Sequence, residues 1–440
     1  MNTSFHQRVE SAMQGPVALY NAALMVALAL GSPLWASLLA LKPRMRTGFF
    51  EKLMGKAPRL RGQQHPGVWF HAVSVGEVMA SLPLLEALSS ACKQRGVWLS
   101  TVTSTGQAVA KAKARGIRDT FYLPYDLPWS VERAIRSLRP GLFITAETEI
   151  WPNLLAGMRR HKIPSAMVNG RISDRSFPQY KRFRSLFKTV LECFEVFCMQ
   201  SQESAERMVA MGADPARVHV VGNMKFDVSI PPLEQSHWRT LLNIPNGAQV
   251  WVAGSTHPGE EEVILRAFLK LSQANPNLYL VIAPRAPERF DEVETLVACM
   301  GVEVRRRTRP TRPGARVILL DSIGELAQVY VLATVVFVGG SLVPKGGHNP
   351  LEAALHGKAV VFGPHMENFR EIASVLLKAG GARSVNNEEE LLLFVGELLR
   401  NPELVERMGH RAQSVLLAHR GATQRTMEIL EPLLERDPWA

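Results

Sequence analysis

Short apolar runs alternate along most of this chain with longer segments whose apolar residues recur at helical spacing. One series of runs begins near Val68 and a second begins at Gln249, and each run is followed by a plausible helix. Strands that alternate with helices form parallel sheets with helices on both faces, so the pattern predicts an α/β fold. The runs are GVWFHAV, GVWLSTVTS, TFYLP, GLFITAET, SAMVN and VFCMQS in the first series, and QVWVAGST, NLYLVIAPR, GVEVRRR, RVILLDS, VVFVGGS and KAVVFGP in the second.

The alternation pauses at VGNMKFDVSIPPLEQSHW, where two prolines and a polar stretch predict a linker. The pause separates two doubly wound, Rossmann-like domains, residues 46–235 and 236–415, each of ordinary domain size. Ligands of such sheets bind beyond the carboxyl ends of the strands. Two halves that face each other therefore predict one central cleft.

A long uncharged segment precedes the first series. No charged residue occurs from Ser11 to Leu41, and a bilayer core needs only roughly 20 apolar residues. Residues 1–45 are therefore predicted to be a membrane anchor with a basic juxtamembrane segment. Asn21 and the break at residues 31–33 leave a shallow interfacial helix or a buried core helix as alternatives. By the positive-inside rule the rest of the chain faces the cytoplasm, because the single Arg8 is outweighed by Lys42, Arg44, Arg46, Lys52, Lys56, Arg59 and Arg61.

The overall charge narrows the possible partners. A formal charge of +11 and a pI near 9.7 favour anions, which include nucleic acid, an anionic membrane surface and phosphorylated substrates. The four cysteines form no C-x-x-C pair, so reduced thiols are expected rather than a zinc site or a disulfide framework. The absence of G-x-G-x-x-G and of a P-loop disfavours a nicotinamide dehydrogenase and a P-loop NTPase. No D-x-D pair is present, so a bound nucleotide needs no obligatory divalent ion.

The segment VVFVGGSLVPKGGHNPLEAALHG combines a buried strand with a glycine-rich loop and a helix start. Asn349 is predicted as the N-cap, with Pro350 at the first helical position. The free N–H groups and the positive helix end then form an anion site, to which Lys345 adds a charge. Glu352 has the spacing of a capping box with Asn349, so it either caps the helix or accepts the hydroxyls of a ribose.

A similar ambiguity concerns the stretch VWFHAVSVGEVMASLPLLEAL. Ser74 and Glu77 have capping-box spacing at the start of the helix that follows the first strand. Gly76 is a poor helix former in that first turn, but it leaves room for a substrate beside the Glu77 carboxylate. Glu77 therefore either caps the helix, or does chemistry there, or both. Polar clusters at other strand ends, such as AGSTHPGEE, APRAPERF and DSIGEL, are predicted to open into the same cleft.

Several of these motifs together resemble one known family. HAVSVGE, YLPYD, ETEIWPN, GNMKFD, STHPGEE, PERF, FVGGSLVPKGGHNPLEA and FGPHMENF occur in order from Val68 to Phe369 and are similar to the 3-deoxy-D-manno-octulosonic acid (Kdo) transferases. The resemblance implies a metal-independent, inverting GT-B glycosyltransferase with no cofactor. Its donor would be CMP-Kdo and its acceptor a lipid A precursor (lipid IVA), in lipopolysaccharide synthesis at the cytoplasmic face of the bacterial inner membrane. In GT-B folds the last helix, here within residues 416–440, packs back on the first domain.

The resemblance also implies roles for residues on the acceptor side. Glu77 would be the general base that takes the proton from the acceptor hydroxyl, with Ser74 and Gly76 beside it. Glu147 and Lys225 would line the reaction centre and stabilise the transition state. Read from the sequence alone, Glu147 is equally a cap for the helix after Pro152, and Lys225 is equally an exposed lysine.

Donor binding is implied for the second domain, with the leaving phosphate against the Asn349 helix end. The family often has His after Pro-Arg, whereas this chain has Ala286, so one contact to the base or phosphate is expected to differ. The donor-binding residues implied are Ser255, Thr256, Pro284, Arg285, Ile323, Gly324, Glu325, Gly346, Gly347, His348, Asn349, Pro350, Leu351 and Glu352.

Two other functions stay open at this point. A GT-B transferase or epimerase that uses a UDP sugar has the same architecture. A membrane-tethered module that binds nucleotide or nucleic acid fits the basic charge, but the chain lacks the basic patches interleaved with aromatics that single-strand binders use. Binding of nucleic acid is therefore not expected.

Overall fold

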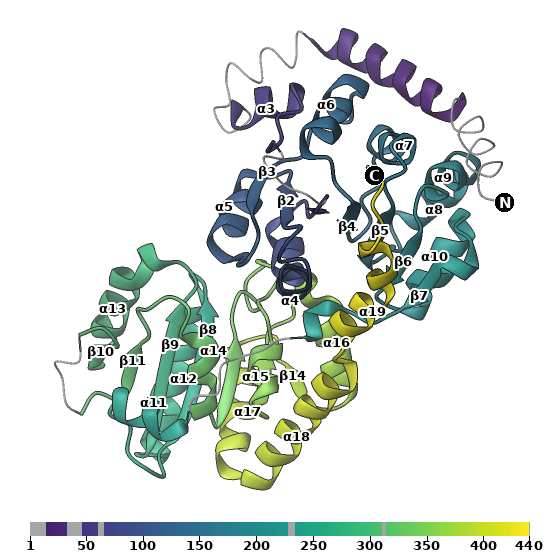
Figure 1. The fold of residues 1–440 in the computed structure, drawn as a ribbon. Helices are drawn as coiled ribbons and strands as arrows, with labels where there is room; N and C mark the ends of the chain where they lie inside the picture. Colours follow the sequence, from purple (N-terminus) through teal and green to yellow (C-terminus); the bar gives the residue numbers. More distant parts are fainter. Residues whose placement is uncertain (1–14, 33–45, 60–65, 228–233, 310–313, 440) are drawn as a thin grey trace. The chain divides into compact units, whose positions relative to one another are not determined.

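The computed structural model describes residues 15–32, 46–59, 66–227, 234–309 and 314–439. The chain divides into two compact units (Figure 1). Unit 1 comprises Met1–Asp227 and Arg420–Ala440, and unit 2 comprises Val228–His419. The chain thus leaves unit 1 once and returns to it for its last helix.

Unit 1 is built on a seven-stranded sheet of order β3-β2-β1-β4-β5-β6-β7, in which every pairing is parallel. The four central strands β2, β1, β4 and β5 are buried along their whole length, as expected of a sheet covered on both faces. The strands are β1 (Val68–His71), β2 (Val97–Thr101), β3 (Asp119–Tyr122), β4 (Leu142–Ala146), β5 (Ser165–Gly170), β6 (Val196–Met199) and β7 (Val218–Val220).

Helices of unit 1 connect these strands and cover the sheet. Side-chain caps start several of them: Ser74 accepts from Glu77 N–H before α4, and Ser201 accepts from Ser204 N–H before α10. The helices are α3 (Phe49–Leu53), α4 (Val75–Ala91), α5 (Ser104–Lys113), α6 (Pro128–Leu138), α7 (Pro152–Arg160), α8 (Phe177–Arg182), α9 (Arg184–Leu191), α10 (Gln202–Met211), the 3-10 turns η1 (Pro215–Arg217) and η2 (Met224–Phe226), and α19 (Ala422–Leu434).

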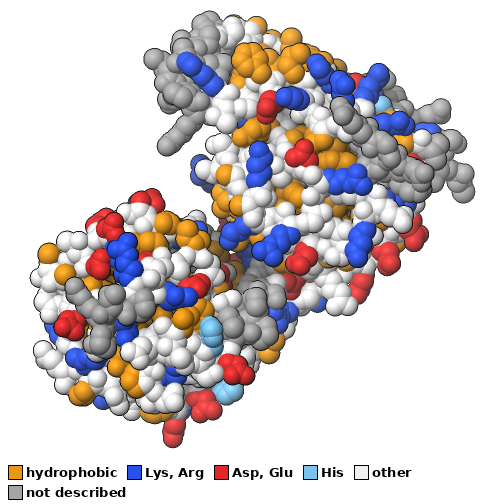
Figure 2. Space-filling view, turned by 60° about the vertical axis from the view of Figure 1, so that its left-hand side comes forward, with side chains coloured by type: hydrophobic (Ala, Val, Ile, Leu, Met, Phe, Trp, Pro, Cys, Tyr) orange, Lys and Arg blue, Asp and Glu red, His pale blue; other side chains and the backbone are white. Residues whose placement is uncertain are grey.

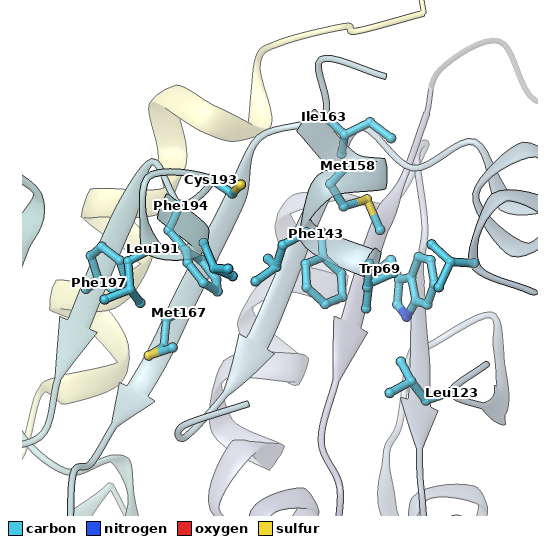
Figure 3. Packing of buried hydrophobic residues seen from close by; sticks show 14 of the residues in the cluster. Trp69, Leu123, Phe143, Met158, Ile163, Met167, Leu191, Cys193, Phe194 and Phe197 are labelled. Carbon is cyan, nitrogen blue, oxygen red and sulfur yellow. The ribbon is translucent and has the colours of Figure 1, made fainter. Parts of the chain in front are cut away.

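Each face of this sheet has its own hydrophobic core. On one face Trp69, Phe143 and Phe197 pack with residues of α6, α7 and α10 (Figure 3). On the other face α4 packs against α19, through Leu84 and Leu88 among others on α4 and Leu430 on α19. The returning C-terminal helix is therefore part of the unit 1 core.

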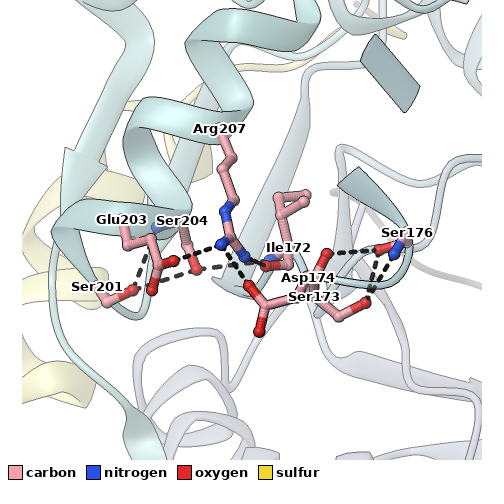
Figure 4. Close-up of polar contacts among 8 residues, drawn as sticks. All are labelled: Ile172, Ser173, Asp174, Ser176, Ser201, Glu203, Ser204 and Arg207. Carbon is pink, nitrogen blue, oxygen red and sulfur yellow. Dashed lines mark hydrogen bonds and ion pairs between the residues drawn. The ribbon is translucent and has the colours of Figure 1, made fainter. Parts of the chain in front are cut away.

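A polar network ties the loop after β5 to α10. Arg207 donates to the carbonyl of Ile172 at 2.7 Å and forms ion pairs with Asp174 and Glu203 (Figure 4). Ser204 adds a hydrogen bond from Ile172 N–H. These contacts fix the loop that follows a central strand.

Unit 2 repeats the design with a second parallel sheet, of order β10-β11-β9-β8-β12-β13-β14. Its strands are β8 (Gln249–Thr256), β9 (Leu278–Pro284), β10 (Val304–Arg306), β11 (Val317–Leu319), β12 (Val335–Val338), β13 (Ala359–Phe362) and β14 (Ala382–Ser384). Its helices are α11 (Gln235–Leu241), α12 (Glu260–Ala274), η3 (Pro287–Arg289), α13 (Phe290–Cys299), α14 (Leu326–Val329), η4 (Tyr330–Leu332), α15 (Leu351–Leu355), η5 (Glu367–Phe369), α16 (Arg370–Lys378), α17 (Glu388–Arg400) and α18 (Pro402–His419).

An apolar helix, Gly15–Ser32, belongs to unit 1. It is the one helix among the described residues that is long and apolar enough to cross a membrane, with a mean hydropathy of 1.5. Its half-buried residues include Val17, Tyr20, Asn21 and Leu24, whose spacing defines one stripe of a helix. That stripe faces the rest of unit 1.

The predicted α/β class with two parallel sheets is confirmed, and all twelve predicted strands are present. Two strands were not predicted: β7, which lies at one edge of its sheet, and β14, which lies at an edge of the other. Each is three residues long, and neither is a buried apolar run. Much of the predicted linker, residues 228–233, lies outside the described residues.

Candidate functional site

The first group of candidate residues lies where β1 and β4 pair at the centre of the unit 1 sheet. The chain leaves these two neighbouring strands in opposite directions along the sheet, toward β2 and toward β5. Such a switch point is where open parallel sheets bind their ligands. Ser74 and Glu77 follow β1, and Glu147 follows β4.

Glu77 caps the helix on which it sits. Its Oε2 accepts from Val73 N–H at 2.7 Å, and its Oε1 accepts from the Ser74 hydroxyl at 3.0 Å. Ser74 Oγ in turn accepts from Glu77 N–H at 3.5 Å. The predicted reciprocal box is present, although Glu77 reaches one residue further back than the N-cap. Beside it, a Cβ added to Gly76 would meet only Ser74 Oγ, at 3.9 Å, so the space next to the carboxylate is open.

The electrostatics of Glu77 differ from those of an exposed cap. Burial raises the pKa of its carboxyl above the ordinary value, and the nearby charge of Glu147 raises it further. The hydrogen bonds from Val73 and Ser74 and the charge of Lys225 act in the opposite direction on this pKa. A carboxylate with a raised pKa is a stronger base, which is what general base catalysis near neutral pH requires.

Glu147 and Lys225, which the resemblance implies as reaction-centre residues, have side chains that lie close together. Lys225 Nζ is 4.0 Å from Glu147 Oε1, and both side chains are about three-quarters buried. Lys225 is held in η2, where Asn223 Oδ1 accepts its backbone N–H at 3.0 Å. The backbone of Glu147 has φ of 56°, a left-handed conformation that is uncommon outside glycine and that concentrates at functional sites.

A third carboxylate, Glu149, was missed as a site residue, although it lies in the same ETEIWPN motif. Burial raises its pKa to about 7, and the charges of Glu77 and Glu147 contribute to that rise. The local sequence does not single out Glu149, because its raised pKa depends in part on Glu77, which only the pairing of strands in the sheet brings close. We call Glu77, Glu147 and Glu149 the carboxylate cluster.

Glu149 gives this cluster a measurable pH dependence. Between the ordinary pKa of 4.5 and about 7 the folded chain keeps a proton that the unfolded chain has lost. Stability therefore falls as the pH rises through this window. We predict that Glu149→Gln melts a few degrees higher than the unchanged protein at pH 8 and at about the same temperature at pH 4.5. Glu206→Gln, at an exposed position of α10, is the control; an equal gain in both variants, or none in Glu149→Gln, would contradict the raised pKa.

The second group of candidate residues lies at the corresponding switch point of unit 2, where β8 pairs with β12. The glycine-rich loop after β12 is organised by Glu260, a fully buried residue. Its carboxylate accepts four backbone N–H groups, from His257 at 3.0 Å, Gly340 at 2.7 Å, Ser341 at 2.9 Å and Leu342 at 2.9 Å. An internal carboxylate thus binds the first part of the loop, whereas the predicted anion site lies at the other end of the loop, before α15.

The helix after this loop is also short for a helix whose N-terminus is predicted to bind an anion. The helix α15 has five residues, begins at Leu351 and so starts one position later than predicted. Asn349 Oδ1 nevertheless accepts from Leu351 N–H at 3.0 Å, and Asn349 Nδ2 donates to Glu352 Oε1 at 3.4 Å. Five residues give only a small dipole, so charged side chains must contribute most of any attraction for an anion.

The positive charges of Arg285 and Lys345 lie near a pair of histidines, His257 and His348. The rings of His257 and His348 are parallel, with their Nε2 atoms 2.9 Å apart, so one ring donates a hydrogen bond to the other. Burial, followed by the charge of Arg285, lowers the pKa of His348 to about 4. Burial also lowers the pKa of His257, and Lys345 and Arg285 contribute. At neutral pH both rings are uncharged, and the cations beside them carry the positive charge of the site.

The other implied donor-binding residues follow four strands that are neighbours in the sheet, β11, β9, β8 and β12. Ser255, with φ of 57°, and Thr256 end β8, and Arg285 N–H donates to the Thr256 carbonyl at 3.0 Å. Glu325 is paired with Arg307 at 3.1 Å, and Ile323 beside it is 82% exposed. The structure thus brings to one edge of unit 2 the residues Ser255, Thr256, Pro284, Arg285, Ile323, Gly324, Glu325, Gly346, Gly347, His348, Asn349, Pro350, Leu351 and Glu352.

Two further sequence expectations concern metals and thiols. Within the described ranges, no group of three or more His, Cys, Asp or Glu side chains is arranged to hold a metal ion. None of the four cysteines forms a disulfide; Cys92, Cys193 and Cys198 are buried and Cys299 is exposed. Burial raises the pKa of Cys193 and Cys198 to about 12, so these thiols are unreactive.

The role of Glu260 can be tested by stability. We predict that Glu260→Ala lowers the free energy of unfolding by about 3–5 kcal/mol, because four buried or partly buried N–H groups lose a charged acceptor. Glu260→Gln, which keeps one oxygen, should lose less. Chemical denaturation measures both, with Glu389→Ala, an exposed first-turn glutamate of α17, as the control. A loss below about 1 kcal/mol in Glu260→Ala would refute the anchoring role.

Both the fold and the sequence of this chain resemble those of known proteins. The fold is GT-B-like: a solved glycosyltransferase from Rickettsia africae matches with a TM-score of 0.55 and 12% identity, over 85% of this chain and all of that one. Residues 43–228 match the family model described as 3-deoxy-D-manno-octulosonic-acid transferase (kdotransferase).

Curated relatives extend that match to most of the chain. The 3-deoxy-D-manno-octulosonic acid transferase of Haemophilus influenzae is 36% identical over 377 residues, which cover 84% of this chain and 88% of that protein. The enzyme of the same name from Bordetella pertussis is 33% identical over 380 residues, 83% of this chain and 87% of its own length. The chain therefore belongs to the 3-deoxy-D-manno-octulosonic acid transferase family, and it is a glycosyltransferase of lipopolysaccharide synthesis.

Proposed function

We propose that this enzyme transfers Kdo from CMP-Kdo to a lipid A precursor, with inversion at the anomeric carbon and without an obligatory metal ion or other cofactor. Glu77 is the general base in this proposal, and Glu147 and Lys225 stabilise the transition state. The observation that carries it is the carboxylate cluster with Lys225 at the switch point of unit 1. Family membership supports the sugar that is transferred.

The chemistry of an inverting transfer fits the arrangement around Glu77. The acceptor hydroxyl must lose a proton as its oxygen attacks the anomeric carbon of Kdo, and a positioned carboxylate takes that proton. The hydrogen bonds from Val73 and Ser74 hold the Glu77 carboxylate in place. The open space beside Gly76 admits the acceptor sugar. When Glu77 takes up the proton, the repulsion between its charge and that of Glu147 is relieved, which favours proton transfer.

Glu149 has a supporting role in the same proposal. With a pKa of about 7, it is partly protonated at neutral pH, so the cluster does not carry three full negative charges. Lys225 offsets the charge of Glu147, 4.0 Å away. The Lys225 ammonium has three N–H donors, so it can also donate a hydrogen bond to the carboxylate of the incoming Kdo.

Unit 2 supplies groups suited to the donor. CMP carries a phosphate, whose negative charge rises as the bond to Kdo breaks, and preorganised positive groups stabilise such a leaving group. Arg285 and Lys345 lie close enough to the histidine pair to lower its pKa values. These cations take the place that a divalent ion holds in metal-dependent transferases. Glu352, hydrogen-bonded to Asn349, is then the acceptor for the ribose hydroxyls.

The acceptor is a lipid, so the enzyme acts at a membrane. The apolar helix Gly15–Ser32 supports attachment to the bacterial inner membrane, with both units on the cytoplasmic side. A net charge of +11 favours the anionic membrane surface, the acceptor phosphates and the donor alike.

The base assignment predicts a separation of binding from chemistry. Glu77→Gln keeps the capping oxygen and should bind CMP-Kdo normally, but it should lose transfer by roughly 10²–10⁴-fold because the amide cannot take a proton. Release of CMP and mass spectrometry of the lipid product measure transfer. Glu86→Gln, exposed further along α4, is the matched control. Transfer by Glu77→Gln within a few fold of the unchanged enzyme would leave Glu77 as a cap only.

The open space at Gly76 predicts that a larger residue there preserves stability but weakens binding of the acceptor. Alanine is favoured over glycine in a helix by about 1 kcal/mol, and the added Cβ meets no atom closer than 3.9 Å. We therefore expect Gly76→Ala to keep or raise the melting temperature while the KM for the lipid acceptor rises several-fold. An unchanged acceptor KM would show that this space does not hold the acceptor.

A further inference from the structure

We infer that the apolar helix Gly15–Ser32 does not cross the bilayer but lies along an anionic phospholipid surface, docked on unit 1 by the stripe that contains Tyr20 and Asn21. This inference concerns how the enzyme sits at the membrane, and it does not depend on which residue is the base.

The docking contacts are polar and specific. The side-chain amides of Asn21 and Asn153 pair with each other in both directions, Asn21 Nδ2 to Asn153 Oδ1 at 3.0 Å and Asn153 Nδ2 to Asn21 Oδ1 at 2.7 Å. The Tyr20 hydroxyl is hydrogen-bonded to the carboxyl of Asp126. Val17 on the same stripe packs against the hydrophobic core. Together these contacts form a seat for one face of the helix.

The partners of the helix are interior residues of unit 1. Asn153 is 4% exposed and Asp126 is 7% exposed. Asp126 also accepts from the backbone N–H groups of Asn153 at 3.0 Å and Leu154 at 2.8 Å, at the start of α7. These residues belong to the folded body of the enzyme, so they cannot follow the helix into hydrocarbon.

Length shows that docking and spanning exclude each other. Asn21 lies eleven residues before Ser32, which is about 16 Å along a helix axis. If the helix crossed with its Ser32 end at the cytoplasmic boundary, Asn21 would lie near the middle of a hydrocarbon core about 30 Å thick. Asn153 would have to lie there too. A helix that keeps the Asn21–Asn153 pair must therefore stay at the surface.

The opposite face of the helix is suited to lipid. Its polar stripe is turned to the protein, and the remainder is apolar and open, with Leu19 70%, Val26 57% and Leu30 79% exposed. An apolar surface of this extent is typical of a membrane contact. In Figure 1 the helix, in purple, runs past α6 and α7.

A second apolar element flanks the same segment of unit 1. Helix α3 exposes 74% of Phe50, and Met54 after it is 49% exposed. The Lys52 carbonyl accepts from Tyr125 N–H at 3.0 Å, so α3 is joined to the residue next to Asp126. Trp129, 51% exposed at the start of α6, continues this surface, as an interfacial aromatic would.

Positive charges beside these apolar residues define the kind of lipid. Arg46, Lys56 and Arg59, all exposed, lie just before and after α3. Figure 2 shows Lys and Arg side chains close to apolar ones along the top of the view. Basic residues near an anionic leaflet are attracted to it, so the surface matches anionic phospholipid headgroups around an apolar interior.

Labelling of the N-terminal segment decides between the two orientations. The full-length chain with Cys299→Ser, which removes the exposed thiol, receives one new cysteine, Ser11→Cys. Cytoplasmic-membrane vesicles with the cytoplasmic face outward are treated with a membrane-impermeant maleimide. Lys113→Cys, exposed on α5, reports full access. We expect Ser11→Cys to be labelled to more than half the extent of Lys113→Cys before detergent is added. Protection of more than half of it until detergent is added would mean that the helix spans, and would overturn the inference.

The seat itself is tested by two leucine substitutions. Asn21→Leu removes both amide hydrogen bonds and makes the helix more apolar, so a major share of Ser11→Cys should become protected. Ala22→Leu adds apolar bulk on the exposed face and should leave labelling unchanged. Equal labelling in the two variants would show that the Asn21–Asn153 pair does not hold the helix at the surface.

The lipid is tested with the purified full-length chain and vesicles. Sedimentation with phosphatidylglycerol vesicles should exceed that with phosphatidylcholine vesicles several-fold, and Lys56→Glu with Arg59→Glu should remove most of the difference. Equal binding to both lipids would contradict the assignment of an anionic surface.

Discussion

Parallel pairing of two central strands, β1 with β4 in unit 1 and β8 with β12 in unit 2, is the constraint on which the candidate site depends. Neighbouring parallel strands end at the same edge, and at a switch point the chain turns away on both sides and leaves a crevice. Glu77 and Glu147 meet because their strands are neighbours, although 70 residues separate them in the chain. The histidine pair in unit 2 forms for the same reason, across 91 residues.

Buried carboxylates act in opposite ways at the two switch points. Glu260 has four backbone donors and is a structural anchor, since a buried charge that is fully hydrogen-bonded is held firmly. In the carboxylate cluster, burial raises the pKa of Glu77 and of Glu149, and repulsion between like charges raises both further. A site that keeps such repulsion is less stable than it need be, and sites of this kind are typical of catalysis. Glu147 and Ser255 add left-handed backbone at the ends of β4 and β8.

Much of this arrangement could be predicted from the sequence. Alternating apolar runs identified twelve of the fourteen strands in the described ranges, and capping-box spacing identified the contact between Ser74 and Glu77. The edge strands β7 and β14 were missed, because three residues without a buried apolar run carry no pattern. Glu260 was seen only as part of a motif, since its role depends on N–H groups about 80 residues away. The raised pKa of Glu149 depends on a strand pairing that no local pattern encodes.

The composition of the apolar helix Gly15–Ser32 and its contacts with unit 1 indicate different positions relative to a membrane. Its length and lack of charge fit a span, whereas its stripe of Val17, Tyr20, Asn21 and Leu24 fits a seat on unit 1. Asn153, which completes that seat, lies four residues after Glu149 in the chain. The helix α7, which contacts the apolar helix through Asn153, is thus continuous with the loop that carries Glu147 and Glu149.

The central claim is that the Glu77 carboxylate takes the proton from the acceptor. Chemical rescue tests it most directly: transfer by Glu77→Ala is measured with increasing formate, a small carboxylate that fits the space left by the side chain. We expect almost no transfer without formate and a rate that rises with formate concentration and then saturates. Transfer by Glu77→Ala that is close to that of the unchanged enzyme and indifferent to formate would contradict it.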